Sequence, residues 1–170
     1  YKVYAAYCGD DIFTLAKVIR DGGKLSVKIK KLSGKKLDPS KHVKVYVVAY
    51  RRAEEDGSVS HHRIGKSITA HVAGKNNKRY SNAVKITVLK KNYTLKKGKT
   101  AKIQAKTILE FKGRKQLSDG HTKEFRYASS NTGIATVSKI GKITAKKKGS
   151  CVVYVYARNG LTKKVKVTVE

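Results

Sequence analysis

The sequence predicts an all-β protein made of two tandem β-sandwich domains. Apolar residues alternate with lysine and threonine in many short runs, which is the pattern of strands buried on one face. Turn signals such as Asn159-Gly160 separate these runs, and helix signals are nearly absent. A chain of 170 residues has room for two sandwiches, each of under about 100 residues. We therefore expect one domain at residues 1–88 and a second at residues 89–170.

The first domain is expected to begin with a strand at residues 1–8, where apolar and polar positions alternate. The apolar positions of residues 10–20 also have helical spacing, and an aspartate there could cap a helix. Strand-rich surroundings nevertheless favour a strand at residues 13–19. A glycine turn then leads into a half-buried strand whose apolar face is formed by Leu25, Val27 and Ile29.

The remainder of the first domain alternates loops with short strands. A polar loop at residues 32–42 contains the single proline and leads into an apolar strand at residues 43–50. An exposed hairpin loop then carries the adjacent histidines His61-His62.

The second domain is expected to follow a short polar link at residues 89–92. Tyr93 and Leu95 lie before a Lys97-Gly98-Lys99 turn. After the turn, one apolar face is formed by Ala101, Ile103 and Ala105.

Two hairpins complete the second domain. In the first, residues 135–137 return as residues 142–145 through a loop that ends in glycine. In the second, an alternating run from Cys151 to Ala157 returns as the strand of Val165, Val167 and Val169. We predict a two-residue type I′ turn at Asn159-Gly160, because this pair tolerates positive φ angles.

The hairpin region also carries the motifs of a known family, in a fairly specific order. The matching residues are Tyr127, Ser129-Ser130-Asn131, Ile134-Ala135-Thr136-Val137, Gly141-Lys142-Ile143, Ala145, Gly149, Asn159-Gly160 and the closing Val165, Val167 and Val169. In them the second half of the chain resembles the bacterial immunoglobulin-like domain of the group 2 type. The resemblance implies a β-sandwich that recurs as a module in bacterial surface proteins, adhesins and large secreted enzymes. It implies no catalytic residue, so we expect neither an enzyme nor a cofactor.

The first half resembles fibronectin type III domains, most clearly at Leu37-Asp38-Pro39-Ser40-Lys41-His42-Val43. That family usually has a tyrosine where Val43 stands, and its hydroxyl ties the corner to the loop. Similarity to the closing strands of bacterial fibronectin-like repeats comes from Ile64-Gly65-Lys66-Ser67, Ala70-His71-Val72 and the run from Ser81 to Val88. The resemblance implies a sandwich in which residues 1–8 are the third strand. Two strands are then expected upstream of the given chain.

The chain is strongly basic, with 40 lysine and arginine residues against 11 acidic ones and a net charge of +29. Both halves share this charge, since residues 1–88 contribute +12 (19 basic, 7 acidic) and residues 89–170 contribute +17 (21 basic, 4 acidic). Such a charge accelerates encounter with polyanions and opposes self-association. Most of the basic residues are lysines on alternate strand positions, which is also the pattern of an ordinary solvated sheet face.

The possible sites of chemistry are few. Cys8 and Cys151 lie one in each half, so we expect two free thiols. A nucleophilic set of Cys151, His121 and Asp119 has no motif support. A metal site at His61-His62 is disfavoured, because neighbouring residues on a strand point to opposite faces. We therefore predict no catalytic residue and no metal site.

A ligand surface is the one functional site that the sequence suggests. Tyr154 and Tyr156 should face outward if Cys151 and Val153 face inward. Together with basic residues they could bind a glycan or a nucleic-acid strand. The candidate ligand-binding residues are Lys142, Lys146, Lys147, Lys148, Tyr154 and Tyr156. Ordinary cross-strand pairing of tyrosines is the simpler alternative.

Three functions remain open from the sequence. The first is a stalk or adhesin segment of a secreted or wall-attached bacterial protein, whose partners are its neighbouring domains and an anionic cell-wall or host polysaccharide. The second is an accessory, glycan-binding region of a large extracellular hydrolase. Binding of nucleic acid is disfavoured because arginine, which reads guanine, is scarce. No apolar run approaches the roughly 20 residues of a membrane span, so we expect no membrane insertion of the given chain.

Overall fold

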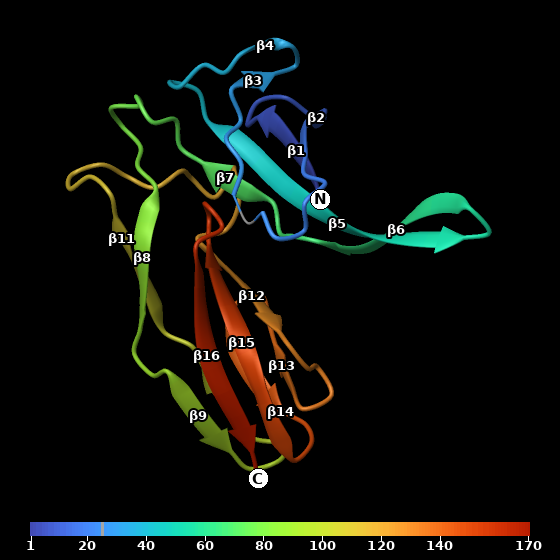
Figure 1. Cartoon of the computed structure of the whole chain (residues 1–170). Helices are drawn as coiled ribbons and strands as arrows, with labels where there is room; N and C mark the ends of the chain where they lie inside the picture. The colour runs from blue at the N-terminus through green and yellow to red at the C-terminus, as the bar shows by residue number, and fades with distance from the viewer. Residues whose placement is uncertain (25) are drawn as a thin grey trace. The chain divides into compact units, whose positions relative to one another are not determined.

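In the computed structural model, residues 1–24 and 26–170 are described, and their regular secondary structure is β-strand. The prediction of an all-β fold is confirmed. No helix among the described residues is long and apolar enough to cross a membrane. The chain divides into two compact units, Tyr1–Lys78 and Arg79–Glu170 (Figure 1).

The first unit is organised around one antiparallel sheet. Its strands, in spatial order, are β2 (Thr14–Val18), β1 (Lys2–Tyr7), β5 (Val43–Glu55) and β6 (Ser58–Lys66), and β7 (Ala70–Val72) pairs with the start of β5. If β1 is the third strand (C) of an immunoglobulin-like sandwich, then β5 corresponds to its F strand. The segments β6 and β7, which both pair with β5, correspond to its G strand. The fibronectin resemblance is consistent with this order and stays a prediction.

Most strands expected in the first unit are confirmed, including β2 in place of a helix. The prediction of a half-buried strand around Leu25 has a different outcome. Leu25 itself lies outside the described residues, and residues 26–30 join no ladder. Val27 and Ile29 are nevertheless half-buried between exposed neighbours. Alternation determines which side chains are buried, whereas a ladder also needs an adjacent strand.

The loops of the first unit contain more structure than expected. The predicted polar loop includes a short hairpin of β3 (Lys31–Leu32) and β4 (Lys35–Lys36). The loop expected around His61-His62 is the hairpin of β5 and β6, which pairs as far as Glu55 and Ser58. Asp56 and Gly57 turn it with φ angles of 50° and 73°. Positive φ at both central positions is the type I′ requirement, and Asp-Gly is its sequence signal.

A tyrosine ties the corner of the first unit, although not from the expected position. Tyr7 is the cross-strand partner of Val43, the residue that replaces the family's tyrosine. The hydroxyl of Tyr7 accepts a hydrogen bond of 2.9 Å from the backbone N–H of Asp38 in the preceding loop. The neighbouring strand thus makes the tie that Val43 cannot make.

The second unit is a sandwich of two layers. One layer contains β8 (Ala83–Val88) paired with β11 (Ala105–Leu109), and β10 (Thr100–Lys102), β14 (Lys142–Ala145) and β13 (Ala135–Val137) in that order. The other is a sheet with the order β12 (Phe125–Ser129), β15 (Gly149–Ala157), β16 (Thr162–Val169) and β9 (Asn92–Leu95). This is the two-layer strand order of an immunoglobulin-like sandwich.

The core of the second unit lies between these layers. Val153, Val155 and Val165 from one sheet are completely buried, as is Ile143 from the facing layer. Every second residue of β15 and β16 contributes to this core. Period-2 alternation therefore predicted the buried face correctly.

Both predicted hairpins are confirmed, but the turn of the second differs. The backbone N–H of Ala157 bonds to the carbonyl of Leu161 at 2.9 Å, which leaves a three-residue loop. Only Gly160 has a positive φ there, at 84°, and Asn159 does not. A type I turn followed by a left-handed glycine is the usual form of such a loop. The Asn159 side chain instead donates to the carbonyl of Ala83 at 2.8 Å.

The division between the units precedes the boundary expected after Val88. β8 pairs with β11, and its residues Ala83 and Ile86 belong to the core of the second unit. The expected closing strand of the first domain is therefore the opening strand of the second unit. Sequence patterning identified the strand correctly, but it carries no information about the strand's partner.

Candidate functional site

The nucleophilic set considered from the sequence is not assembled. Cys151 is buried at the start of β15, where its Sγ lies 3.8 Å from the Ser129 hydroxyl. Asp119 is bonded to Arg158, which follows the other end of β15. Seven residues of strand span roughly 23 Å. Cys151 and Asp119 thus lie at opposite ends of the sandwich.

The other cysteine lies in an environment that suppresses its reactivity. Cys8 is half-buried, with its Sγ 3.9 Å from Nδ1 of His71. Burial raises the pKa of the Cys8 thiol. The protonated thiol is a poor nucleophile. Both cysteines are free, as expected.

The adjacent histidines of the β5–β6 hairpin do not converge on a site. His61 stands opposite Arg52, and His62 opposite Arg51. Because neighbours on a strand point to opposite faces, the two rings diverge. The ring of His62 bonds to the Ser60 hydroxyl at 3.0 Å. Glu54 is already paired with Arg52 at 3.0 Å.

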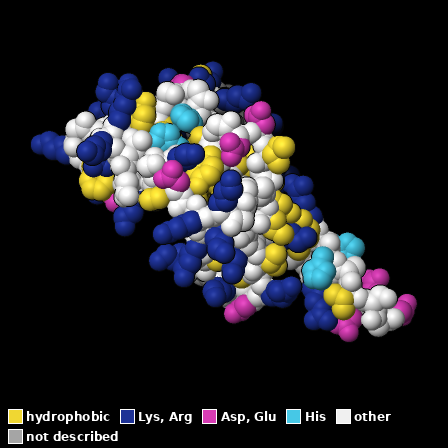
Figure 2. Space-filling view, turned by 90° about the horizontal axis from the view of Figure 1, so that it is seen from above, with side chains coloured by type: hydrophobic (Ala, Val, Ile, Leu, Met, Phe, Trp, Pro, Cys, Tyr) yellow, Lys and Arg dark blue, Asp and Glu magenta, His cyan; other side chains and the backbone are white. Residues whose placement is uncertain are grey.

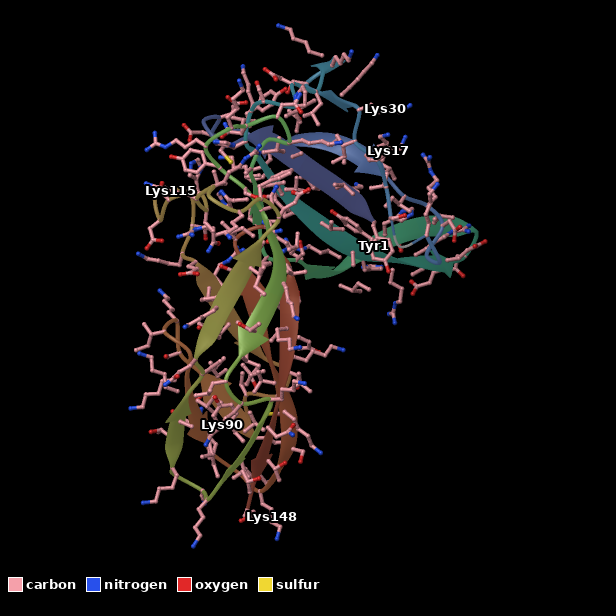
Figure 3. All side chains as sticks on the ribbon, turned by 90° about the vertical axis from the view of Figure 1, so that its left-hand side faces the viewer. Tyr1, Lys17, Lys30, Lys90, Lys115 and Lys148 are labelled. Atoms are coloured by element: carbon pink, nitrogen blue, oxygen red, sulfur yellow. The ribbon has the colours of Figure 1, made fainter. Side chains whose placement is uncertain are left out.

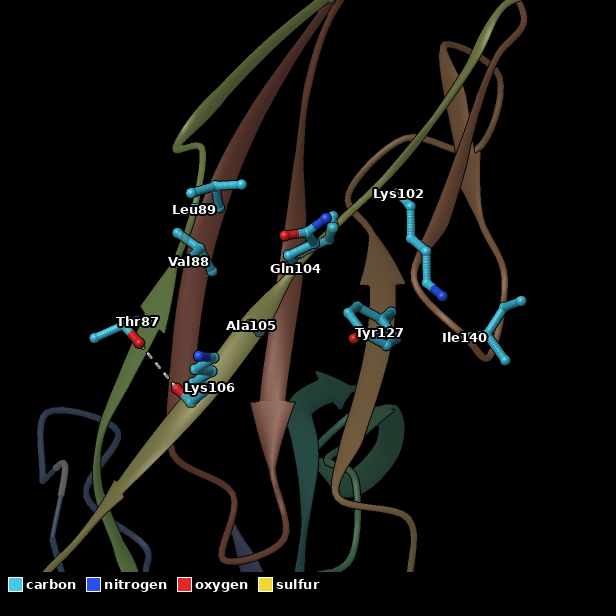
Figure 4. A pocket seen from close by; sticks show the side chains of 10 residues that line it. Thr87, Val88, Leu89, Lys102, Gln104, Ala105, Lys106, Tyr127 and Ile140 are labelled. Atoms are coloured by element: carbon cyan, nitrogen blue, oxygen red, sulfur yellow. Dashed lines mark hydrogen bonds between the residues drawn. The ribbon is translucent and has the colours of Figure 1, made fainter.

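A cavity of about 540 Å³ opens where one layer of the second unit changes partners (Figure 4). β10 pairs with β14, whereas β11 pairs with β8, so the backbone diverges between them. The described lining residues are Thr87, Val88, Leu89, Lys102, Ile103, Gln104, Ala105, Lys106, Tyr127 and Ile140. Burial raises the pKa of Tyr127, so its phenol stays neutral. This described lining contains no carboxylate, histidine or thiol that could act as an acid, base or nucleophile.

The outer face of the other sheet combines aromatic and basic side chains. Tyr154 and Tyr156 both point away from the core, and their ring centroids lie 6.1 Å apart in a stacked arrangement. Lys164 stands directly across from Tyr154 on β16. Burial raises the pKa of Tyr156, with a further contribution from Tyr154, so its hydroxyl carries no charge at neutral pH.

Beside the tyrosines this face is hollowed. A shallow depression of about 330 Å³ is lined by Lys91, Asn92, Ser150, Cys151, Val152, Lys164 and Lys166. Lys166 stands between Val152 on β15 and Asn92 on β9. We call Tyr154, Tyr156, Lys164, Lys166, Lys91 and Asn92 the tyrosine–lysine face. The four strands of this sheet contain no acidic residue.

The structure brings together only part of the set predicted from the sequence. The tyrosines are adjacent, but Lys142 lies on β14 in the other layer and points outward on the opposite side. Lys146, Lys147 and Lys148 form the turn before β15, and Figure 3 labels Lys148 there. Lys148 is six residues from Tyr154, roughly 20 Å along a strand.

The lysines that do accompany the tyrosines were not singled out from the sequence. Lys164 and Lys166 alternate with buried valines, so their outward direction could be inferred. Their position beside Tyr154 depends on the register of β15 with β16, which the altered turn controls. Basic side chains are otherwise scattered over the visible face in Figure 2 and do not form one patch. The tyrosines, and not the charge alone, distinguish the tyrosine–lysine face.

Comparison with known proteins gives one family. The family model described as Bacterial Ig-like domain (group 2) matches residues 82–169, slightly more than half of the chain. No curated protein matches the chain.

Among solved structures, an intimin mutant of EHEC O157:H7 is 22% identical with a TM-score of 0.33, over 49% of this chain and 42% of that one. Domains 4 and 5 of the S-layer protein SbsC are 18% identical with a TM-score of 0.43, over 81% and 69%. A C-terminal intimin fragment, solved with the intimin-binding domain of its translocated receptor, is 11% identical with a TM-score of 0.33, over 78% and 59%. The family match agrees with the motifs of the hairpins and with the two-layer order of the second unit: the chain belongs to the bacterial Ig-like domain (group 2) family.

Proposed function

We propose that the chain is a non-catalytic structural or adhesion module, a stalk or adhesin segment of a secreted or cell-surface bacterial protein. The observation that carries this proposal is the path of the chain through the second unit. The start of β8 lies beside the β15–β16 loop, because Asn159 bonds to Ala83 there. The unit ends at Glu170, after the far end of β16. The chain thus enters this unit at one end and leaves at the other (Figure 1).

The last strand is held in a way that suits transmission of force. β16 pairs in parallel with β9 along Lys166–Asn92 through Val169–Leu95. Backbone N–H groups of Lys166 and Glu170 bond to the carbonyls of Lys91 and Leu95 at 2.8 and 3.0 Å. A pull along the unit loads these bonds together, in shear. A pull at a hairpin end would instead break its bonds one after another.

Single-molecule pulling of the full chain tests this role. We expect the second unit to resist higher force when the handle is on Glu170 than when it is on Thr162, at the start of β16. Forced unfolding reports the barrier to unfolding and not the equilibrium stability. The matched handles leave the fold unchanged and alter only the direction of loading. Equal forces from the two handles would contradict a role in transmitting tension.

The accessory region of an extracellular hydrolase stays a second prediction. The reading frame that encodes the chain distinguishes the two. Further Ig-like repeats or a wall-sorting signal would support the stalk, whereas an adjoining catalytic domain would support the accessory region.

A further inference from the structure

The tyrosine–lysine face offers two kinds of contact in one place. The rings of Tyr154 and Tyr156 are stacked and partly exposed, and Lys164 and Lys166 add positive charge on the same face. Charge alone would not single out this face, because exposed lysines such as Lys85 and Lys106 also occur on the other layer. The depression beside the rings supplies a place for a chain-like ligand to lie.

We propose that this face binds a linear acidic polysaccharide. Tyr154 and Tyr156 pack against sugar rings, while Lys164, Lys166 and Lys91 bind carboxylates along the polymer. Asn92 and the hydroxyl pair of Ser150 and Thr168, 3.2 Å apart, lie on the same face and suit sugar hydroxyls. This inference names the ligand of the adhesion role proposed above and rests on that role.

Three features favour a polysaccharide over a nucleic acid. The tyrosine centroids are 6.1 Å apart, whereas a base inserted between two rings needs about 7 Å at ordinary contact distances. Arg126, the arginine of this sheet, donates to the carbonyls of Ala157 and Arg158 at 3.1 and 3.2 Å. Its Nη2 is therefore already used by the β15–β16 loop, which disfavours a two-pronged contact with phosphate. The remaining cations are lysines, which act as point charges.

Affinity measurements on the full chain with chosen probes test the proposal. Polygalacturonate offers sugar rings and carboxylates, polyglutamate offers carboxylates without sugar rings, and oligodeoxythymidylate offers bases and phosphates. Contacts that depend only on charge weaken steeply with salt. We expect polygalacturonate, and neither other probe, to stay bound at about 0.15 M ionic strength.

Matched variants assign the binding to this face. Replacing both tyrosines by threonine keeps strand propensity and should weaken polygalacturonate binding about tenfold or more, by analogy with aromatic stacking on bases. K164Q with K166Q removes two of the cations that bind carboxylates and should weaken binding about tenfold as well, which corresponds to about 1.4 kcal/mol. K85Q with K106Q removes the same charge from the other layer and should change affinity less than about threefold by the same relation. An unchanged thermal midpoint confirms that each variant folds.

Three results would overturn the proposal. Equal retention of polyglutamate, or equal losses in both lysine pairs, would reduce the face to diffuse charge. Displacement of polygalacturonate by oligodeoxythymidylate at matched charge would make it a nucleic-acid surface. Absence of binding even at low salt would indicate that the lysines serve solubility and not ligand binding. None of these results changes the pulling experiment, so the stalk role and the ligand can fail separately.

Discussion

The two units bury their apolar residues in different ways. In the second unit two layers face each other, and Val153, Val155 and Val165 have no exposed surface. In the first unit Val3 is buried, but Val45 and Val47 on the same side of the sheet are only half-buried. A depression of about 410 Å³ remains there, lined in part by these valines and by Val27 and Ile29.

The difference shows what the second layer contributes. Buried and exposed side chains alternate along strands of both units, and the central strands of both sheets are paired along their length. In the second unit a facing sheet covers the apolar face, whereas in the first unit an irregular segment covers it. Because stability depends mainly on the apolar area removed from water, the second unit should be far more sensitive to changes in its interior.

A charge placed at equivalent positions should give the largest contrast. Val155→Asp puts a carboxylate where no water reaches, and we expect a loss of about 4 to 5 kcal/mol, enough to unfold a marginal unit. Val47→Asp leaves its carboxylate access to solvent from the depression and should cost about 2 kcal/mol or less. Amide hydrogen exchange, resolved by unit, measures each effect. Similar losses in the two units would show that the first interior is as well sealed as the second.

Glycines with positive φ give the next contrast. Gly141 has a φ of 79°, and a Cβ there would lie 2.8 Å from Cζ of Tyr127. Gly57 has a φ of 73° in open space. Gly141→Ala should cost about 2 to 4 kcal/mol from strain and overpacking, and Gly57→Ala about 1 to 2 kcal/mol from strain alone. Thermal unfolding would contradict this account if Gly57→Ala were the more damaging change.

The buried faces could be predicted from the sequence because period-2 patterning is local. β15 and β16 are examples, as is the half-buried pair Val27 and Ile29. Pairing partners are not local. β8 was correctly recognised as a strand, but its pairing with β11 could not be predicted, because nothing in its own pattern distinguishes a closing strand from an opening one.

Turn chemistry explains the remaining differences. A type I′ turn was expected at Asn159-Gly160, but its positive φ angles occur at Asp56-Gly57. The polar residues around Asp56-Gly57 obscure this signal in the sequence. Asn159 departs from that geometry, and its side chain is bonded to Ala83 in a distant strand. The altered turn also changes which lysines lie in the candidate ligand site, because it sets the register of β15 with β16. Tyr154 and Tyr156 follow from alternation, whereas their lysine neighbours follow from cross-strand register.

The corner tie of the first unit should contribute less than either interior. Tyr7→Phe removes the hydroxyl that accepts from Asp38 at 2.9 Å, and we expect a loss of about 1 kcal/mol. Tyr93→Phe is the matched control in the second unit, because its hydroxyl donates to the exposed carbonyl of Lys102 at 3.3 Å. That change should cost less than about 0.5 kcal/mol. Denaturant unfolding would contradict the comparison if the control were the larger.

The smallest contrast concerns acid and salt. A hydrogen bond from Lys123 and then one from Arg158 lower the pKa of Asp119 in the second unit. The Ser40 hydroxyl and backbone N–H lower the pKa of Asp38 in the first unit. Both carboxylates are exposed, so each effect is modest. Because a folded-state pKa below the unfolded value of about 3.9 stabilises only the ionised protein, both contributions are present above about pH 4 and are lost as the pH falls through the folded pKa.

Salt should separate these two carboxylates. The main partners of Asp119 are cations, at 3.0 Å for Lys123, and attraction between exposed charges is screened by about 1 M salt. The main partner of Asp38 is a neutral hydroxyl at 2.6 Å, whose hydrogen bond does not depend on a second charge. Carbon-detected NMR titration at low and high salt should therefore show the pKa of Asp119 rising toward its unfolded value while that of Asp38 stays low. D119N should remove the salt-sensitive part of the acid transition in the second unit and leave the first unit unchanged. If both pKa values rise together, attraction by surrounding lysines lowers the pKa at both sites. The difference between cationic partners at Asp119 and a neutral hydroxyl at Asp38 would then not explain their low pKa values.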